Sequence, residues 1–425
     1  MARQAYRRGR RGFRGGSTVE TVTRAEPAFR WRPVIASALL PSLLFATGEG
    51  AIIPVIPQVA VQLGGTLAAA GIVAAMLLVG TLLGDIPSGV VVARIGERQA
   101  MIAAAIIASG GLGLALLART PWVLALGILL VGVATASFGL ARHAFLTTFV
   151  PIAHRARALS TLGGTFRLGY LIGPFLGAGI IALTASAASV FWFDLACCLA
   201  TAVVLLVLPD PATTVGEARP SRTQSAPVGL FRTIRENARV LGTLGVGSAL
   251  VAALRGSRQV ILPLWAVSIG MHESTASIVL GVAGAVDFAL FYAGGQIMDR
   301  FGRLWTAVPS MVGLGVGHLL LALTSGLPTP VLWFVTIAML LSLANGIGAG
   351  ILMTLGADLA DPTHPAPFLG AWRFCNDTGG AAAPLLIAAV TALASLPVAA
   401  AVLGVLGIGG AVVLRVFVPR YSPHR

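Results

Sequence analysis

Hydrophobic residues fill most of this chain in long stretches that are separated by short polar segments. An apolar run of about 20 residues can cross the hydrocarbon of a bilayer as an α-helix, because a helix satisfies its backbone N–H and C=O groups internally. The pattern predicts membrane-spanning helices over the approximate ranges 34–57, 66–88, 99–118, 122–145, 156–183, 188–208, 238–269, 276–297, 304–325, 331–354, 367–393 and 396–418.

Composition agrees with this pattern. The 425 residues are 56% hydrophobic and only 10% charged, which is far more apolar than a soluble globular protein. We therefore expect a multi-pass protein whose solvent is the lipid bilayer of the plasma (inner) membrane.

The charge distribution predicts the orientation. The formal net charge is +14, and the basic residues, all of them arginine, gather in the N-terminal tail, in alternate loops and at the C-terminus. Loops rich in arginine usually face the cytoplasm. Both termini and the central loop are therefore predicted to be cytoplasmic, and this distribution excludes nucleic acid as a partner.

The two halves of the chain match each other. A shift of 206 residues, the separation of Gly50 and Gly256, aligns three separated segments. The matches are Gly50 to Gly256, Pro57 to Pro263, Ala60 to Ala266, Gly64 to Gly270, Gly89 to Gly295, Arg94 to Arg300, Gly96 to Gly302, Gly164 to Gly370, Arg167 to Arg373 and Gly173 to Gly379.

The repeat predicts the domain organisation. We expect a basic cytoplasmic tail (1–33), a six-helix bundle (34–208), a cytoplasmic linker (209–235), a second six-helix bundle (236–418) and a short cytoplasmic tail (419–425). Parallel repeats of this kind place a site near the bilayer midplane, between the two halves.

A nine-residue motif follows the second and eighth predicted helices. Gly295, Asp299, Arg300, Gly302 and Arg303 fit the full pattern G-x-x-x-D-R-x-G-R. The first-half copy lacks the aspartate, has Glu97 ahead of its last arginine, and keeps Gly89, Arg94, Gly96 and Arg98.

With these motifs, the sequence resembles the major facilitator superfamily over nearly its whole length. The resemblance implies an all-α membrane protein of twelve helices in two pseudo-symmetric bundles. It also implies that the motif gates the cytoplasmic face, with Asp85 as a substitute for the aspartate missing from the first copy.

Two further motifs resemble the twelve-helix drug/proton antiporter branch of that superfamily. In the fifth predicted helix, small residues and a proline form the pattern G-x-x-x-G-P-x-x-G, which is marked by Gly169, Gly173, Pro174 and Gly177. At the end of the first, Gly48 precedes Pro54, Val55 and Pro57. Small residues let helices approach closely and proline bends a helix, so the first motif could act as a rocking contact.

Charges inside the predicted helices are candidates for function, because a charge on the lipid face costs at least about 2.5 kcal/mol. Glu49 and Arg255 are repeat mates on helices that line the central cavity in the family the chain resembles. We expect Glu49 to carry the coupled proton, with its charge tuned by Arg255 or Arg258. The alternative is a permanent Glu49–Arg255 ion pair that only joins the halves. Asp287 is the second proton-coupling candidate, and these four residues form the predicted substrate cavity.

The remaining intramembrane charges are expected to be structural. They lie near helix ends, or form the repeat-related pair of arginines, or fall one helical turn from an opposite charge. They are Asp85, Arg142, His143, Arg167, Arg373, Asp377 and, at the outer start of the sixth helix, Asp194.

The sequence shows no enzyme chemistry. It has no Walker lysine and no cluster of metal ligands, and its three cysteines fall inside predicted helices. No catalytic residue, cofactor or metal is therefore predicted.

The leading hypothesis is a monomeric secondary transporter that exports small amphipathic drugs or metabolites in exchange for protons, by rocker-switch alternating access. One alternative is uptake or exchange of an organic anion, in which Arg255 and Arg258 bind a carboxylate. A non-transporting membrane sensor or scaffold is the alternative from another class.

Overall fold

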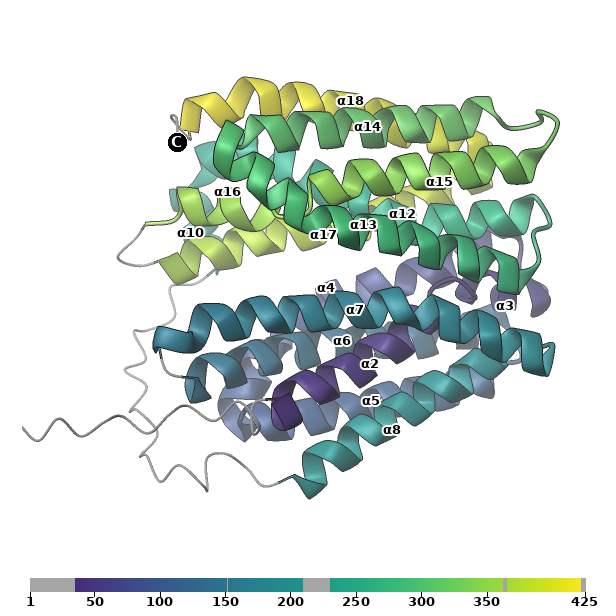
Figure 1. Ribbon diagram of the computed structural model, residues 1–425, viewed down its shortest axis with the longest axis horizontal. Helices are drawn as coiled ribbons and strands as arrows, with labels where there is room; N and C mark the ends of the chain where they lie inside the picture. Colours follow the sequence, from purple (N-terminus) through teal and green to yellow (C-terminus); the bar gives the residue numbers. More distant parts are fainter. Residues whose placement is uncertain (1–34, 151, 209–229, 362–364, 422–425) are drawn as a thin grey trace, which may run out of the picture.

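The structure, a computed structural model, describes residues 35–150, 152–208, 230–361 and 365–421, and these are helical almost throughout (Figure 1). In chain order the helices are η1 (Ile35–Leu39), α2 (Leu40–Ile52), α3 (Ile56–Gln62), α4 (Leu67–Ile95), α5 (Glu97–Leu116), α6 (Pro121–Phe149), α7 (Ile152–Thr184), α8 (Ser189–Val207), α10 (Leu230–Glu236), α11 (Ala238–Val240), η2 (Leu241–Gly245), α12 (Val246–Ser268), α13 (Glu273–Phe301), α14 (Leu304–Leu323), α15 (Pro330–Ile347), α16 (Ile351–Leu359), α17 (Pro365–Leu393) and α18 (Leu396–Tyr421). The predicted basic tail and most of the predicted linker lie outside the described residues.

The helices suit a membrane. Ten of those described are long and apolar enough to cross one, and the bent pair Ser37–Ile52 and Ile56–Gln62 raises the number to eleven when it is counted as one span. The predicted range 367–393 is also helical, as α17. Arg373 and Asp377 make α17 more polar than its neighbours. The chain is therefore an all-α, multi-pass membrane protein.

The helices α4 and α13, which carry the nine-residue motif, run further than their apolar pattern predicts. α4 continues to Ile95 and α13 to Phe301, because hydropathy marks the hydrocarbon layer and not the end of the helix. Most of each nine-residue motif therefore lies on the last helical turns. Gly96 and Gly302 then end the two helices with φ of 86° and 94°, a left-handed backbone that glycine adopts at little cost.

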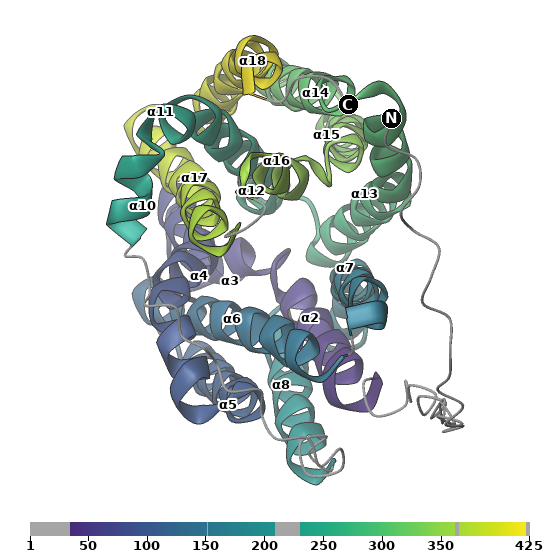
Figure 2. The same ribbon diagram turned by 90° about the vertical axis from the view of Figure 1, so that its left-hand side faces the viewer.

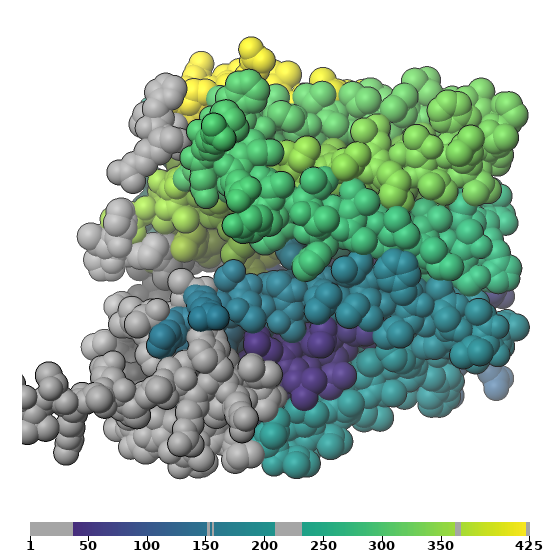
Figure 3. All heavy atoms as spheres, in the orientation of Figure 1, coloured from purple at the N-terminus to yellow at the C-terminus, as the bar shows by residue number. Residues whose placement is uncertain are grey.

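The repeat seen in the sequence is also present in the packing. α2 packs on α7 as α12 packs on α17, and α5 packs on α8 as α14 packs on α18. Figures 1 and 2 show α2–α8 on one side of the molecule and α10–α18 on the other. The halves meet where α4 contacts α17 and where α7 contacts α13; the second contact forms the visible seam in Figure 3.

The proline-containing segment after α2 breaks its helix. Between Ile52 and Ile56 the chain makes a turn, and α3 departs from α2 at 44°. Pro54 lies in this turn and Pro57 in the first turn of α3, where its missing N–H removes no helical hydrogen bond. The bend leaves α2 inside the first half and sends α3 toward α12 of the second half.

Candidate functional site

Glu49 lies inside the first half and is 2% exposed. The Thr135 hydroxyl on α6 donates to its carboxylate at 3.0 Å, and the Tyr170 hydroxyl on α7 is within hydrogen-bonding reach. The Arg142 guanidinium acts on it electrostatically. This acid is therefore held by neighbours from two other helices of its own bundle.

Asp287 is the centre of a second cluster, in the other half. The Asn345 side-chain amide on α15 donates to Asp287 at 2.7 Å, and the Arg258 guanidinium on α12 lies 3.9 Å from the same oxygen. Arg258 also donates to the Ser342 hydroxyl at 2.7 Å. Arg255, one turn away, donates to the Ala349 carbonyl at 3.2 Å. The structure thus brings together three of the four predicted cavity residues.

Glu49 and Arg255, which are expected to face each other, bind different partners in the two halves. Glu49 is bound within the first half, while the interactions of Arg255 are with Ala349, Asp287, Arg258 and Arg167. The sequence repeat predicts which helix carries a residue and how deep in the bundle it lies, but it does not predict which way the side chain points. In the structure, Glu49 on α2 points toward α6. A direct ion pair that joins the halves is therefore not formed among the described residues.

Arg167 connects the first half to the Asp287 cluster. Its guanidinium carbon lies 4.1 Å above the ring of Phe291 on α13, and it interacts electrostatically with Asp287. The predicted structural role of Arg167 therefore includes a contact between the halves.

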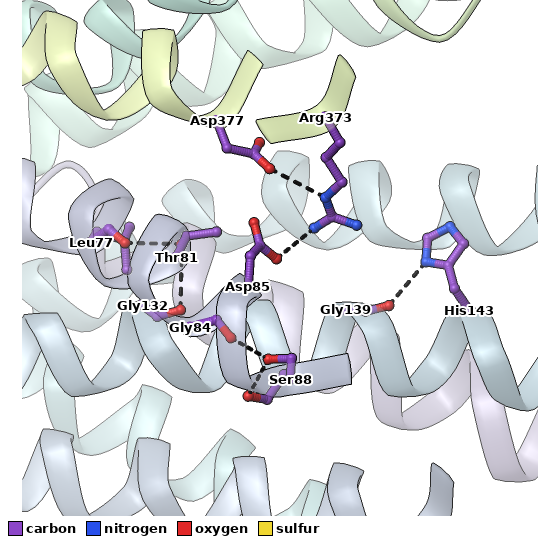
Figure 4. Close-up of polar contacts among 11 residues, drawn as sticks. Leu77, Thr81, Gly84, Asp85, Ser88, Gly132, Gly139, His143, Arg373 and Asp377 are labelled. Atoms are coloured by element: carbon purple, nitrogen blue, oxygen red, sulfur yellow. Dashed lines mark hydrogen bonds and ion pairs between the residues drawn. The ribbon is translucent and has the colours of Figure 1, made fainter. Parts of the chain in front are cut away.

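Arg373, the repeat mate of Arg167, lies in the second half and contacts the first half. From α17 it reaches Asp85 on α4 at 2.8 Å, and its other side bonds Asp377 at 3.2 Å (Figure 4). The predicted pairing of Arg373 with Asp377 one turn later is confirmed. Asp85 forms an interhelical ion pair, and this pair links the two halves.

The complete nine-residue motif ties two helices of the second half. Arg303 binds Asp358 on α16 through two nitrogens, at 2.9 and 3.3 Å, and lies 4.0 Å from Asp299. The hydrogen-bonded Asp358 carboxylate raises the pKa of Arg303 above its ordinary value. Asp299 and Arg300 are exposed, and a Cβ built at Gly295 would meet open space. Within this motif, Arg303 therefore joins two helices and Gly302 ends α13.

The first-half copy of the motif makes different interactions at the equivalent end of its helix. Arg98 donates to the carbonyls of Leu205 and Leu208 and so caps the end of α8, where the helix dipole favours a cation. Glu97, at the position of Arg303, accepts from the Thr148 hydroxyl at 3.2 Å. Gly89 is in open space and Arg94 is exposed.

A comparison with protein families decides what this architecture is. The model of the Major Facilitator Superfamily matches residues 39–384 and 244–425. The chain belongs to the major facilitator superfamily. It is therefore a transporter and not an enzyme, and its substrate is a small molecule.

Several superfamily relatives have names that refer to drugs. The multidrug efflux pump Tap of Mycobacterium tuberculosis is 28% identical over 310 residues, 68% of this chain and 72% of that protein. The class C tetracycline resistance protein of Escherichia coli is 25% identical over 363 residues, 82% of this chain and 87% of that protein. An uncharacterized MFS-type transporter of Mycobacterium tuberculosis is 28% identical over 147 residues; the match spans 34% of this chain but only 21% of that longer protein.

Solved structures of the superfamily share the fold. The nucleoside transporter NupG superposes with a TM-score of 0.72 at 14% identity, covering 91% of this chain and 100% of that one. The inward open xylose transporter XylE from E. coli gives 0.69 at 15% identity, covering 92% and 96%. At such identities the likeness shows the fold alone.

The antiporter-branch motif lies at the crossing of α7 and α2 in this superfamily member. A Cβ at Gly169 would lie 2.7 Å from the Cβ of Ala46, and a Cβ at Gly173 would lie 2.6 Å from the Ala51 nitrogen. Gly177 is less crowded, 3.2 Å from the Ala51 carbonyl, and Pro174 lies within the helix. The motif therefore packs one bundle internally.

Arg142 and His143 on α6 take different positions. Arg142 is 7% exposed and stacks 3.8 Å above the ring of Phe166, and two of its nitrogens have no partner among the described residues. His143 bonds the Gly139 carbonyl of its own helix at 3.0 Å (Figure 4). Arg142 thus belongs to the buried cluster around Glu49.

The neutral members of both clusters are not among the residues predicted from intramembrane charge. Thr135, Tyr170, Ser342 and Asn345 hold the acids and arginines, yet each is an isolated polar residue in an apolar helix. The one available signal was helical spacing, because Thr135 precedes Arg142 by two turns on α6. Spacing alone does not tell which face of a helix meets Glu49.

Proposed function

We propose that this transporter exports small amphipathic molecules in exchange for protons, by alternating access of its two halves. Two relatives that match over most of their length are named as a drug efflux pump and as a drug resistance protein, which supports export. We place the protein in the plasma membrane as a monomer, with both termini cytoplasmic, because arginines gather on that side.

The observation that carries the proposal is one intramembrane acid in each half, with partners suited to two protonation states; Glu49 is buried and Asp287 is partly buried. Glu49 has the Thr135 hydroxyl and the nearby Arg142 charge; Asp287 has the Asn345 amide and Arg258. A hydrogen-bond donor and an arginine stabilise a carboxylate, whereas burial favours its neutral acid. A small movement of the helices can therefore load or release a proton.

The charge balance of the Asp287 cluster narrows the substrate class. Arg255, Arg258 and Arg167 all interact with a single acid, so we expect neutral or anionic molecules to bind better than cations. The same balance supports organic-anion exchange as the second candidate. The Arg255 guanidinium donates to the backbone carbonyl of Ala349, and no carboxylate forms an ion pair with it among the described residues.

The test uses purified protein in liposomes with an imposed pH gradient. The probes are tetracycline and three fluorescent amphipathic dyes, one neutral, one anionic and one cationic. We expect gradient-driven movement of neutral or anionic probes, abolished by a protonophore. Exchange that persists undiminished without a gradient, and falls on Arg255→Ala, would support the second candidate instead.

Glu49→Gln tests the proton-coupling residue. The amide keeps the size of the side chain but cannot release a proton, so we expect gradient-driven transport to fall by about a hundredfold while downhill exchange continues. Glu236→Gln is the matched control, because Glu236 on α10 has an exposed side chain paired only with nearby Arg232 among the described residues. Full gradient-driven transport by Glu49→Gln would refute this role.

A further inference from the structure

Asp194 on α8 is a buried acid that the proposed mechanism leaves unused. Asp194 is expected at the outer start of the sixth helix, and the structure encloses its side chain within the first half, where it is only 1% exposed. It packs against Gly48 on α2 so closely that a Cβ built at Gly48 would overlap with its Oδ1 atom. The absence of a side chain at Gly48 is therefore what gives this carboxyl group its space.

Asp194 has few groups to stabilise a negative charge. Oδ1 accepts from the Cys198 thiol at 3.6 Å, and a thiol is a weak donor. Oδ2 is buried with no partner among the described residues. An ionised carboxylate without strong donors or a paired cation is very costly in such surroundings. The least costly state of Asp194 in this conformation is the protonated acid.

The titratable neighbours of Asp194 lead to the proposed coupling site. Glu49, the residue after Gly48, and Tyr170 on α7 both interact with it electrostatically. On its own helix the neighbours are Cys197 and Cys198. Tyr170 is also within hydrogen-bonding reach of Glu49, whose further partners are Thr135 and Arg142, as described above. The two acids thus belong to one polar cluster between α2, α7 and α8.

The fold itself does not require this acid. The 206-residue shift places Leu254 of α12 at Gly48 and Ala400 of α18 at Asp194, and both are fully buried. α12 packs on α18 as α2 packs on α8. The same crossing is therefore filled by apolar side chains in the second half. A carboxyl group that costs free energy in only one repeat points to function.

We propose that Asp194 is a second proton carrier, which passes protons between the outer surface and Glu49 through the interior of the first half. This inference rests on the proposed function. α8 begins at Ser189, on the side opposite to the arginine-rich loops, so Asp194 lies about 7 Å along the helix from that end. The Asp194 acid gives its proton to the Glu49 carboxylate, directly or through a water molecule, and regains one from outer water. No other bond changes and no redox partner is needed.

The first test needs no substrate and no variant. Dicyclohexylcarbodiimide reacts with protonated carboxyl groups in apolar surroundings, and mass spectrometry of the wild-type protein locates its adducts. We expect an adduct on Asp194 at neutral pH, which decreases as the pH is raised. Labelling of Glu49 with none on Asp194 would overturn the proposal.

The second test measures transport of tetracycline in liposomes. Asp194→Asn keeps the shape of the side chain but cannot carry a proton, so gradient-driven transport should fall by about a hundredfold while downhill exchange is retained. Glu236→Gln is the matched acid-to-amide control, because Glu236 on α10 has an exposed side chain and lies outside this cluster; its transport should stay within about twofold of wild type. Size-exclusion profiles verify that each variant is folded.

The outcomes separate this inference from the proposed function. If Glu49→Gln abolishes gradient-driven transport and Asp194→Asn does not, the proton reaches Glu49 by another route and the inference is wrong. If neither substitution affects the gradient-driven rate, proton coupling through this half fails as a whole. Loss in both variants, with exchange retained in both, supports the relay.

Discussion

Single residues decide how closely the helices of each bundle cross. At Gly173 a Cβ would lie 2.6 Å from both the Thr47 carbonyl and the Ala51 nitrogen, so the backbone of α7 touches that of α2. Gly179, on the same helix, has nothing within 4 Å. Some glycines of α7 are therefore needed for close helix contact, whereas others have room for a larger side chain.

Gly173→Ala is expected to destabilise the protein. The added methyl group must push α7 and α2 apart, and overpacking of this kind costs about 1–3 kcal/mol. Thermal unfolding followed by size-exclusion fluorescence measures the loss. Gly179→Ala should unfold at the wild-type temperature or slightly above, because alanine favours the helix. Equal stability of the two variants would show that α7 is free to shift.

Pairs of helices carry the contact between the halves, and the two pairs are repeat mates. Arg373 on α17 binds Asp85 on α4, while Arg167 on α7 covers Phe291 on α13. The 206-residue shift turns Arg167 into Arg373 and Asp85 into Phe291. The two contacts occupy equivalent positions in the repeat. The one between α17 and α4 is an ion pair, and the one between α7 and α13 is a cation–π contact.

Removing either contact should change the equilibrium between transporter conformations by a modest and similar amount. An ion pair with a half-exposed arginine contributes about 0.2–1 kcal/mol, and an exposed cation–π contact about 0.5–1 kcal/mol. Asp85→Asn and Phe291→Leu should each shift the open fraction of the cytoplasmic side by up to about fivefold. Distances between spin labels on α4 and α17 report this fraction.

The double variant provides the control. The two contacts lie at different seams, so their free energies should add within about 0.5 kcal/mol. A double variant that behaves like either single variant would mean that both contacts act on one shared step. A shift in the opposite direction would mean that the contacts stabilise the open state.

Polar contacts join the two halves of the molecule near both ends of the helices. At the end that the arginine distribution predicts to be outer, Gln58 and Gln62 of α3 donate to Glu273 at the start of α13, at 2.9 and 3.2 Å. Toward the end predicted to be cytoplasmic, Arg373 binds Asp85. Alternating access requires that one of these bridges opens while the other stays closed, because both join the two halves.

Cross-linking the outer bridge should therefore stop transport. In a background without the native cysteines, Gln58→Cys with Glu273→Cys is treated with a short bifunctional thiol reagent, and liposome flux is measured before and after. We expect flux to fall to background, since the outer side can no longer open. Ser88→Cys with Ser137→Cys is the control, because these hydroxyls lie 2.8 Å apart within one half. Continued flux through the cross-linked outer pair would contradict alternating access at this seam.

The sequence by itself determined the helices, their duplication and the places where charges enter the bilayer. These follow from local properties, because a run of apolar residues must be helical in lipid and a repeated glycine needs the same backbone in both halves. Gly96 and Gly302 show this directly, since both end a helix with positive φ.

The tertiary structure alone decided which partner each charge has. Glu49 turned out to bind Thr135 within its own half, Asp85 to bind Arg373 across the halves, and Asp194 to be buried against Gly48. A helix that is apolar on nearly every side gives no sign of which face meets a neighbour. The partner of a charge is set by the rotation and depth of packed helices, which depend on residues distant in the sequence.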